Sequence, residues 1–317
     1  MLCKNTLKGI TALALWSACA LFTTLMENIP TYEIMTAAFA CSFLVTIIRI
    51  RRSKETESAF RCDWKLIAVA LVCLLCNENS YLLAFKHAPP AHVDLINYLW
   101  PIFFLGLAGM FGRQKVTVQQ AIAAVVCFYG IYVLFSGEDS SFSSEYLFGY
   151  SCAFIAAVSW AFYSFYSSKK QEGSPNIMGL CCAPLTIVCG VMHLTTETFV
   201  MPTLTEFFSM IALGGGVMGL SYNLWENGIK HGNSSILSVF AYFTPIASIA
   251  LLVLFGFSEA TTALLLSLLL IVTGSLLSSV QIPWGRLLSP LRDALAKRLS
   301  LGQIPDAYML ARLYDWK

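Results

Sequence analysis

Long apolar runs, separated by short polar or charged stretches, follow one another along almost the whole chain. They lie at about 9–26, 31–48, 65–85, 91–111 and 117–136 in the first half, and at about 146–168, 176–195, 206–229, 234–256 and 261–280 in the second. A helix needs about 20 apolar residues to cross the roughly 30 Å hydrocarbon core of a bilayer. The runs are continuous rather than alternating, which favours helices over the strands of a membrane barrel. The pattern predicts an all-α polytopic membrane protein with ten transmembrane helices.

A register of matching residues indicates that the second half repeats the first. Four matches share one offset of 144 positions: Lys86-His87 with Lys230-His231, Tyr98 with Tyr242, Pro101 with Pro245, and Trp16 with Trp160. Each half then holds five spans, and an odd number of spans inverts the second copy relative to the first, as in many secondary transporters. We expect the first repeat at 1–140 and the second at 141–280.

Lys and Arg are distributed unevenly between the loops, and this distribution predicts the orientation. With the N-terminus in the cytoplasm, the inner loops hold most basic residues: Arg49, Arg51, Arg52, Lys54, Arg61, Arg113, Lys115, Lys169, Lys170 and Lys230. The opposite loops hold acids, with Lys86 as the exception: Glu27, Glu138, Asp139, Glu145, Glu197 and Glu259. Both termini are therefore predicted to be cytoplasmic.

The two ends of the chain have their own patterns. Met1–Lys8 is short and basic, and Ala18-Cys19-Ala20 fits a signal-peptide cleavage site. The match of Trp16 to Trp160 favours a first membrane span instead, because a cleaved leader has no reason to match an internal segment. The tail, 281–317, combines leucines at helical spacing with basic residues, so we expect a cytoplasmic amphipathic helix on the inner membrane surface.

Composition and motifs exclude several classes of function. The 317 residues are 57% hydrophobic and 12% charged, with mean hydropathy +0.69, which is about half the charge of a soluble domain. Eleven cysteines lie mostly in apolar runs, where they act as small hydrophobes. The sequence holds no Walker pattern, no nucleophile motif and no metal-binding pattern among its four histidines. We expect no enzyme activity, cofactor, metal site or nucleic-acid partner.

Polar side chains inside the predicted spans are candidates for binding. A charged group in mid-bilayer costs roughly 2.5–3.5 kcal/mol on insertion scales, so such residues usually face a polar cavity. Glu78 lies in the third span, and Asp94, Asn97 and Tyr98 share one face of the fourth. Each acid also has a structural alternative. Glu78 could be a protonated carboxyl bonded to a neighbouring asparagine, and Asp94 could cap its helix.

The eighth span carries a matching polar and aromatic patch, since Tyr222 falls on Glu78 and Trp225 on Tyr81 in the repeat register. Glu226 precedes Lys230 by four positions, so the two could instead pair with each other. Trp16 and Trp160 could likewise be interfacial residues. The predicted substrate-binding residues are Trp16, Glu78, Tyr81, Asp94, Asn97, Tyr98, Trp100, Trp160, Tyr163, Tyr222, Trp225, Glu226 and Tyr242.

On these residues the chain resembles the EamA branch of the drug/metabolite transporter superfamily. Segments 97–101 (NYLWP), 225–233 (WENGIKHGN) and 242–245 (YFTP) are similar to the YddG-type aromatic amino acid exporters. The resemblance covers about 5–280. It implies a bacterial inner-membrane protein with alternating access and proton-linked or exchange transport. It also implies a central cavity lined by Tyr98, Trp100, Trp160 and Tyr242.

We therefore expect a secondary transporter of small amphipathic metabolites, first of all aromatic or other amino acids, acting as an exporter or exchanger. Acidic groups beside aromatic walls suit a flat ring with a positive centre. S-adenosylmethionine, exchanged for S-adenosylhomocysteine, also has these features and is the alternative substrate. A non-transporting membrane enzyme or receptor is the alternative from another class. The expected partners are the substrate, the bilayer and a coupled proton or counter-substrate, with the chain as a monomer or weak homodimer.

Overall fold

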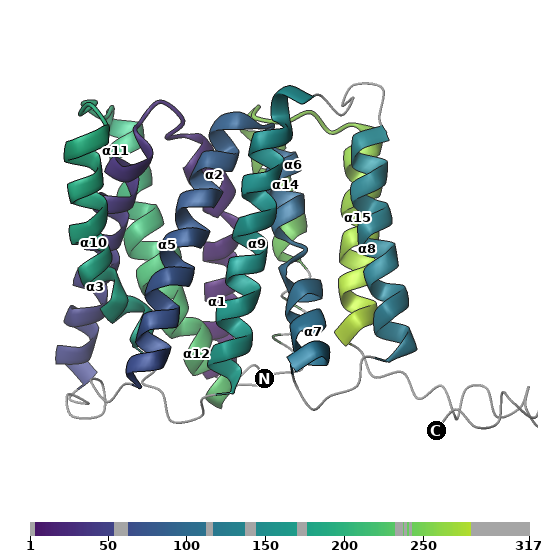
Figure 1. Ribbon diagram of the computed structural model, residues 1–317, viewed down its shortest axis with the longest axis horizontal. Helices are drawn as coiled ribbons and strands as arrows, with labels where there is room; N and C mark the ends of the chain where they lie inside the picture. Colours follow the sequence, from purple (N-terminus) through teal and green to yellow (C-terminus); the bar gives the residue numbers. More distant parts are fainter. Residues whose placement is uncertain are drawn as a thin grey trace, which may run out of the picture. The chain divides into compact units, whose positions relative to one another are not determined.

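Every regular element that the structure describes is helical, as the apolar runs predict (Figure 1). The computed structural model describes residues 4–53, 63–111, 117–136, 144–169, 176–231, 237, 240 and 243–279. The first half contains α1 (Lys4–Ser17), α2 (Cys19–Thr24), α3 (Thr31–Ser53), α5 (Trp64–His87), α6 (Pro90–Asn97), α7 (Trp100–Phe111) and α8 (Val118–Ser136). The second half contains the short helix η1 (Ser144–Tyr146), α9 (Leu147–Ser168), α10 (Ile177–Thr196), α11 (Leu204–Ile211), the π-helix η2 (Ala212–Leu220), α12 (Ser221–His231), α14 (Thr244–Leu254) and α15 (Thr262–Ser279).

Within the described residues, eight helical spans are long and apolar enough to cross a membrane. They occupy the positions of the first eight predicted spans, which confirms a multi-span helical protein. Helices α14 and α15 are shorter apolar helices at the ninth and tenth positions. The count of ten transmembrane helices therefore stays a prediction. The predicted tail, 281–317, lies outside the described residues.

Three of the spans are interrupted in the structure. The first span breaks at Ala18 between α1 and α2, and the fourth breaks at Tyr98 and Leu99 between α6 and α7. The eighth passes through η2. Pro101 explains the second break, because a proline ring clashes with the carbonyl four residues earlier, at Asn97, where α6 ends.

Contacts between distant segments define one end of the helix bundle, which we call the acidic end. There the Glu197 carboxylate, which follows α10, accepts hydrogen bonds from the backbone N–H groups of Tyr32 (3.1 Å) and Glu33 (3.3 Å) at the start of α3. Lys86, near the end of α5, donates its Nζ to the Ile29 carbonyl at the same end. The start of α3 is thus tied to both repeats.

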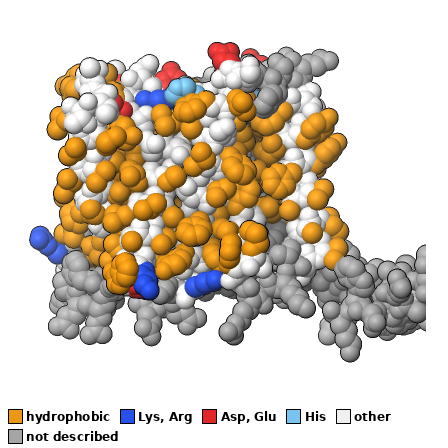
Figure 2. Space-filling view, viewed as in Figure 1, with side chains coloured by type: hydrophobic (Ala, Val, Ile, Leu, Met, Phe, Trp, Pro, Cys, Tyr) orange, Lys and Arg blue, Asp and Glu red, His pale blue; other side chains and the backbone are white. Residues whose placement is uncertain are grey.

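The opposite, basic end joins the other helix termini. Arg49 near the end of α3 donates to the Asn176 side chain before α10, and Lys169 donates to the Phe111 carbonyl at 2.9 Å. Acidic side chains gather at the acidic end and most basic side chains at the basic end (Figure 2). Helix α1 starts at the basic end, whereas α9 starts at the acidic end, where Gly149 packs against the end of α5. The first helices of the two halves therefore run in opposite directions.

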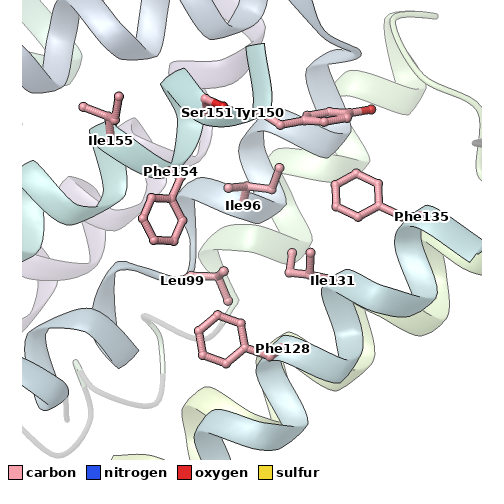
Figure 3. Close-up of a pocket in the computed structure, with 9 residues that line it drawn as sticks. All are labelled: Ile96, Leu99, Phe128, Ile131, Phe135, Tyr150, Ser151, Phe154 and Ile155. Carbon is pink, nitrogen blue, oxygen red and sulfur yellow. The ribbon is translucent and has the colours of Figure 1, made fainter. Parts of the chain in front are cut away.

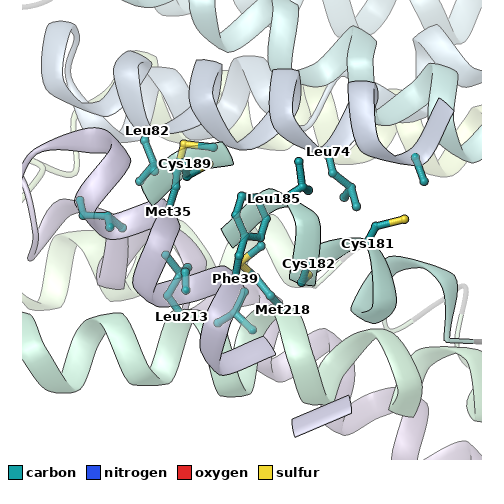
Figure 4. Close-up of a cluster of buried hydrophobic side chains, with 14 of the residues drawn as sticks. Met35, Phe39, Leu74, Leu82, Cys181, Cys182, Leu185, Cys189, Leu213 and Met218 are labelled. Carbon is teal, nitrogen blue, oxygen red and sulfur yellow. The ribbon is translucent and has the colours of Figure 1, made fainter. Parts of the chain in front are cut away.

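The largest buried core lies between α3, α5, α10 and η2 (Figure 4). Met35 and Phe39 of α3 meet Leu74 of α5, Leu185 of α10 and Met218 of η2 there. Lipid tails are as apolar as these side chains, so burial from water contributes little to helix association inside a membrane. Close van der Waals packing stabilises the helix contacts instead.

Glycines of η2 allow this close packing against α3. A Cβ added at Gly214 would lie 2.5 Å from the Ala38 Cα, and one added at Gly219 would lie 3.0 Å from the Ser42 Cα. At Gly216 the nearest atom to an added Cβ is 3.8 Å away, which is an ordinary contact distance. Gly214 and Gly216 of the same segment therefore differ in whether they leave room for a side chain.

We predict that Gly214→Ala lowers the thermal unfolding temperature of the detergent-purified protein, because the added methyl group meets the α3 backbone, which cannot rotate away. Overpacking of this kind costs about 1–3 kcal/mol. Gly216→Ala is the matched control and should unfold close to the unsubstituted protein. Equal unfolding temperatures for the two variants would contradict the close approach of η2 to α3.

Candidate functional site

Five aromatic side chains from three helices meet inside the bundle and form what we call the aromatic cluster: Trp16 of α1, Trp160 and Tyr163 of α9, and Tyr222 and Trp225 of α12. The centroid of the Trp16 ring lies 5.3 Å from that of Trp225 and 6.1 Å from that of Tyr222. Trp160 stacks on Tyr222 at 5.8 Å with 27° between the planes, and its ring lies 5.9 Å from Tyr163. All five belong to the predicted set, and they come from both halves.

Backbone irregularities lie beside the cluster. Trp16 lies two residues before the break at Ala18, and Tyr222 is the second residue of α12, directly after the π-helix η2. Trp160 and Tyr163 are three positions apart on α9, so they share a face. Trp16, Trp160 and Tyr222 pack against the largest core. This packing favours an interior position for Trp16 and Trp160.

Glu78 brings a carboxyl group to the aromatic cluster. It lies on α5, about 12 Å along the helix from Lys86 at 1.5 Å per residue, and is half-buried. The Asn77 side chain donates a hydrogen bond to Glu78 Oε1 at 3.2 Å. Glu78 is also close enough to Tyr222 to interact with it electrostatically. No described Lys, Arg or His forms an ion pair with Glu78, and the Asn77 bond agrees with the alternative of a structural carboxyl group.

A second set of polar side chains lies on helices α2, α6 and α14, and we call it the Asp94 group: Thr23, Asp94, Asn97, Thr244 and Ser248. Each has a buried oxygen without a hydrogen-bond partner among the described residues. Asp94 is only 2% exposed, and the Ser248 and Tyr81 hydroxyls lie beside its carboxylate. Helix α6 begins at Pro90, so Asp94 is beyond the first turn, and the alternative that it caps the helix is wrong.

The remaining candidates lie outside these two sets. Tyr81 is buried beside the Asp94 carboxylate and packs on Phe85, with ring centroids 4.8 Å apart. Tyr98 lies in the break between α6 and α7, near Asp94. Trp100 of α7 is half-buried and makes no ring contact with the aromatic cluster within the described ranges. Tyr242 and the side chain of Glu226 lie outside the described residues.

Sequence reasoning did not single out three members of the Asp94 group, namely Thr23, Thr244 and Ser248. It also did not single out Cys19, whose thiol lies beside Thr23 and Tyr81 and within electrostatic range of Asp94. Small hydroxyl and thiol residues are common in membrane helices, where they often bond to the backbone of their own helix. The repeat register was the one sequence feature that pointed toward these residues, because it matched Pro245, the neighbour of Thr244, with Pro101.

An apolar pocket of about 360 Å³ opens between α6, α8 and α9 (Figure 3). Ile96, Phe128, Phe135 and Phe154 are among the residues that line it, and Ser151 and Tyr150 are its only side chains with a hydroxyl. None of its lining residues belongs to the aromatic cluster or to the Asp94 group. It suits an apolar chain rather than a zwitterion.

The described helices contain no group of three or more His, Cys, Asp and Glu side chains that could hold a metal ion. The site is instead aromatic and acidic, inside a multi-span helical bundle. Comparison with known families agrees with this architecture. The model of the EamA-like transporter family matches the chain twice, over residues 6–136 and 147–280. The chain belongs to the EamA-like transporter family. It is a transporter built of two EamA repeats.

Curated relatives extend the match over most of the chain. The chain is 28% identical to an aromatic amino acid exporter YddG of Ancylobacter novellus, over 87% of this chain and 96% of the relative. It is 26% identical to proteins of the same name from Escherichia coli, over 78% and 87%, and from Salmonella typhimurium, over 86% and 96%. A crystal structure of a protein 28% identical to it superposes with a TM-score of 0.70, covering 88% of this chain and 97% of that one. With its apolar spans, the chain is a multi-pass inner-membrane protein.

Proposed function

We propose that this transporter exports or exchanges aromatic amino acids, with the substrate ring held in the aromatic cluster and its ammonium group at Glu78. The proposal is carried by the meeting of five aromatic rings from α1, α9 and α12, together with the Glu78 carboxyl group of α5 within electrostatic range of Tyr222. The relatives named aromatic amino acid exporters support the substrate class.

The aromatic cluster and the Glu78 carboxyl group together fit a zwitterion with a flat side chain. Aromatic rings prefer tilted or offset-stacked partners with centroids 4.5–7 Å apart, and such a pair contributes about 0.5–1.5 kcal/mol beyond burial. Trp160 and Tyr222 already stack in this way, so a substrate ring can join them. The ammonium group of an amino acid is a compact cation that a carboxylate such as Glu78 stabilises where little water is present.

The mechanism that we infer is alternating access by two halves, 1–140 and 141–280, each with five spans in inverted orientation. The opposite directions of α1 and α9 support the inversion. Pro101 and Pro245 are each the second residue of a helix, α7 and α14, and the halves would move about these duplicated positions. A coupled proton or counter-substrate would supply the driving force, and the tail, 281–317, would lie on the inner membrane surface.

S-adenosylmethionine is the competing substrate, because it also joins a flat ring to a positive centre. Its exchange for S-adenosylhomocysteine would use the same rings and the same carboxyl group. Competition experiments separate the two substrate classes.

We predict that both termini are cytoplasmic, because the basic ends of the described helices then face the cytoplasm. Green fluorescent protein fused after Lys317 of the full chain should fluoresce in bacteria. Alkaline phosphatase fused at the same position should be inactive, since it folds only outside the cytoplasm. An active phosphatase fusion with a dark fluorescent fusion would reverse the proposed orientation.

Tryptophan should support counterflow in proteoliposomes that contain the purified protein, and Trp160→Ala should weaken it by about 2- to 10-fold, since one stacking partner is lost. Trp160→Phe retains a ring and should keep most of the activity. Trp64→Ala is the control, because Trp64 is 71% exposed at the start of α5. Counterflow of S-adenosylmethionine that unlabelled tryptophan does not inhibit would favour the competing substrate.

Glu78→Gln should raise the KM for tryptophan counterflow by about tenfold or more, because the amide cannot balance the ammonium charge and a hydrogen bond to a charged group contributes about 1.5–3 kcal/mol. Glu27→Gln, which alters an exposed acid in the turn after α2, should leave KM unchanged. The variant's unfolding temperature would show that it still folds. An unchanged KM in folded Glu78→Gln would remove Glu78 from the substrate site.

A further inference from the structure

The Asp94 group has a composition that the proposed substrate site does not use. The buried atoms of the group that lack a well-aligned hydrogen bond are all oxygens: Thr23 Oγ1, Asp94 Oδ2, Asn97 Oδ1, Thr244 Oγ1 and Ser248 Oγ. The Ser248 and Tyr81 hydroxyls nevertheless lie beside the Asp94 carboxylate, and Thr23 lies beside the Cys19 thiol. An unsatisfied buried polar atom costs about 1–3 kcal/mol, and folded proteins leave few of them. Elsewhere in the described ranges, Ser267 has a hydroxyl of this kind. The presence of several such oxygens on three neighbouring helices therefore points to a ligand that several oxygens can contact at once.

The helices that carry these oxygens are mutual neighbours. Helix α14 packs on both α2 and α6, and α2 packs on α6. Asp94 and Asn97 are three positions apart on α6, and Thr244 and Ser248 are four positions apart on α14, so each pair shares a face. The Ser248 hydroxyl links the two helices, because it lies beside both the Asp94 carboxylate and the Tyr98 hydroxyl.

The donor chemistry favours a monovalent hard cation. Carboxylate, amide and hydroxyl oxygens bind hard cations, whereas transition metals prefer nitrogen or sulfur. Calcium sites usually combine several carboxylates, and the group has one, Asp94. The net negative charge of the group therefore comes from Asp94, which matches one positive charge.

We propose that the Asp94 group binds a sodium ion and that its occupancy is coupled to the aromatic cluster. The coupling rests on the proposed transport function, whereas sodium binding does not. The connection runs through the break at Ala18: Thr23 follows it on α2, and Trp16 precedes it on α1. Cys19, at the start of α2, lies within electrostatic range of both Glu78 and Asp94. An ion that draws Thr23 toward α6 and α14 shifts the segment that carries Trp16.

Thermal unfolding of the detergent-purified full chain tests the binding step. At constant ionic strength, sodium chloride should raise the unfolding temperature saturably, and potassium and choline chlorides should not. Asp94→Asn should abolish the response, and Ser248→Ala should shift its midpoint to higher sodium concentration. Ser267→Ala, which alters another unpartnered buried hydroxyl on α15, should respond like the unsubstituted protein. Equal unfolding temperatures in all three salts, or an unchanged response in Asp94→Asn, would overturn the sodium site.

Proteoliposomes then separate this inference from the proposed function. An inward sodium gradient should accelerate tryptophan counterflow in the unsubstituted protein and have no effect in Ser248→Ala at the same sodium concentration. Sodium-dependent stabilisation without any tryptophan counterflow would retain the ion site and reject the substrate. Counterflow that is indifferent to sodium would reject the coupling. Stabilisation by tryptophan alone that disappears in Asp94→Asn would assign Asp94 to the substrate and overturn the sodium site.

Discussion

The hydrocarbon core of a membrane supplies no water, so every backbone N–H and C=O group within it must find a partner in the protein. Helices meet this requirement, and irregular backbone is tolerated only where protein surrounds it. The breaks at Ala18 and at Tyr98–Leu99 lie beside the aromatic cluster and the Asp94 group. Trp16 precedes the first break, and Asp94 precedes the second. Because backbone polar groups need partners where no water is present, both the irregular backbone and the polar side chains lie in the interior, and the exterior is apolar.

The positions of the helices follow from the sequence, because a run of about 20 apolar residues has few other stable arrangements. The breaks do not follow as readily. Ala18 is a good helix former with neither proline nor glycine beside it, so its break depends on tertiary packing. Proline alone is also ambiguous, since Pro101 follows a break whereas Pro184 lies inside the uninterrupted helix α10. Whether a proline breaks the backbone hydrogen bonds of its helix therefore depends on the packing of the neighbouring helices.

The candidate site, too, follows from the sequence only in part. The repeat register marks Trp16 and Trp160, and large rings or carboxyl groups in apolar runs are conspicuous in a sequence. Hydroxyl side chains are not. Thr24 donates to the Ala20 carbonyl of its own helix at 2.9 Å, whereas the adjacent Thr23 has a buried oxygen without a described partner. The sequence presents two equivalent threonines, and only their surroundings distinguish a satisfied hydroxyl from one that is available to a ligand.

The bond between Glu197 and the start of α3 has a consequence for movement at the acidic end. Pro30, directly before α3, offers no side-chain acceptor, so the first N–H groups of that helix depend on a carboxylate 165 positions later. Parting the two segments would leave those N–H groups without partners, and the carboxylate would keep His193 of its own helix, at 3.0 Å. Only water entering the gap can offset that loss. Separation of these segments and entry of water are therefore coupled, and a dry separated form would be unstable.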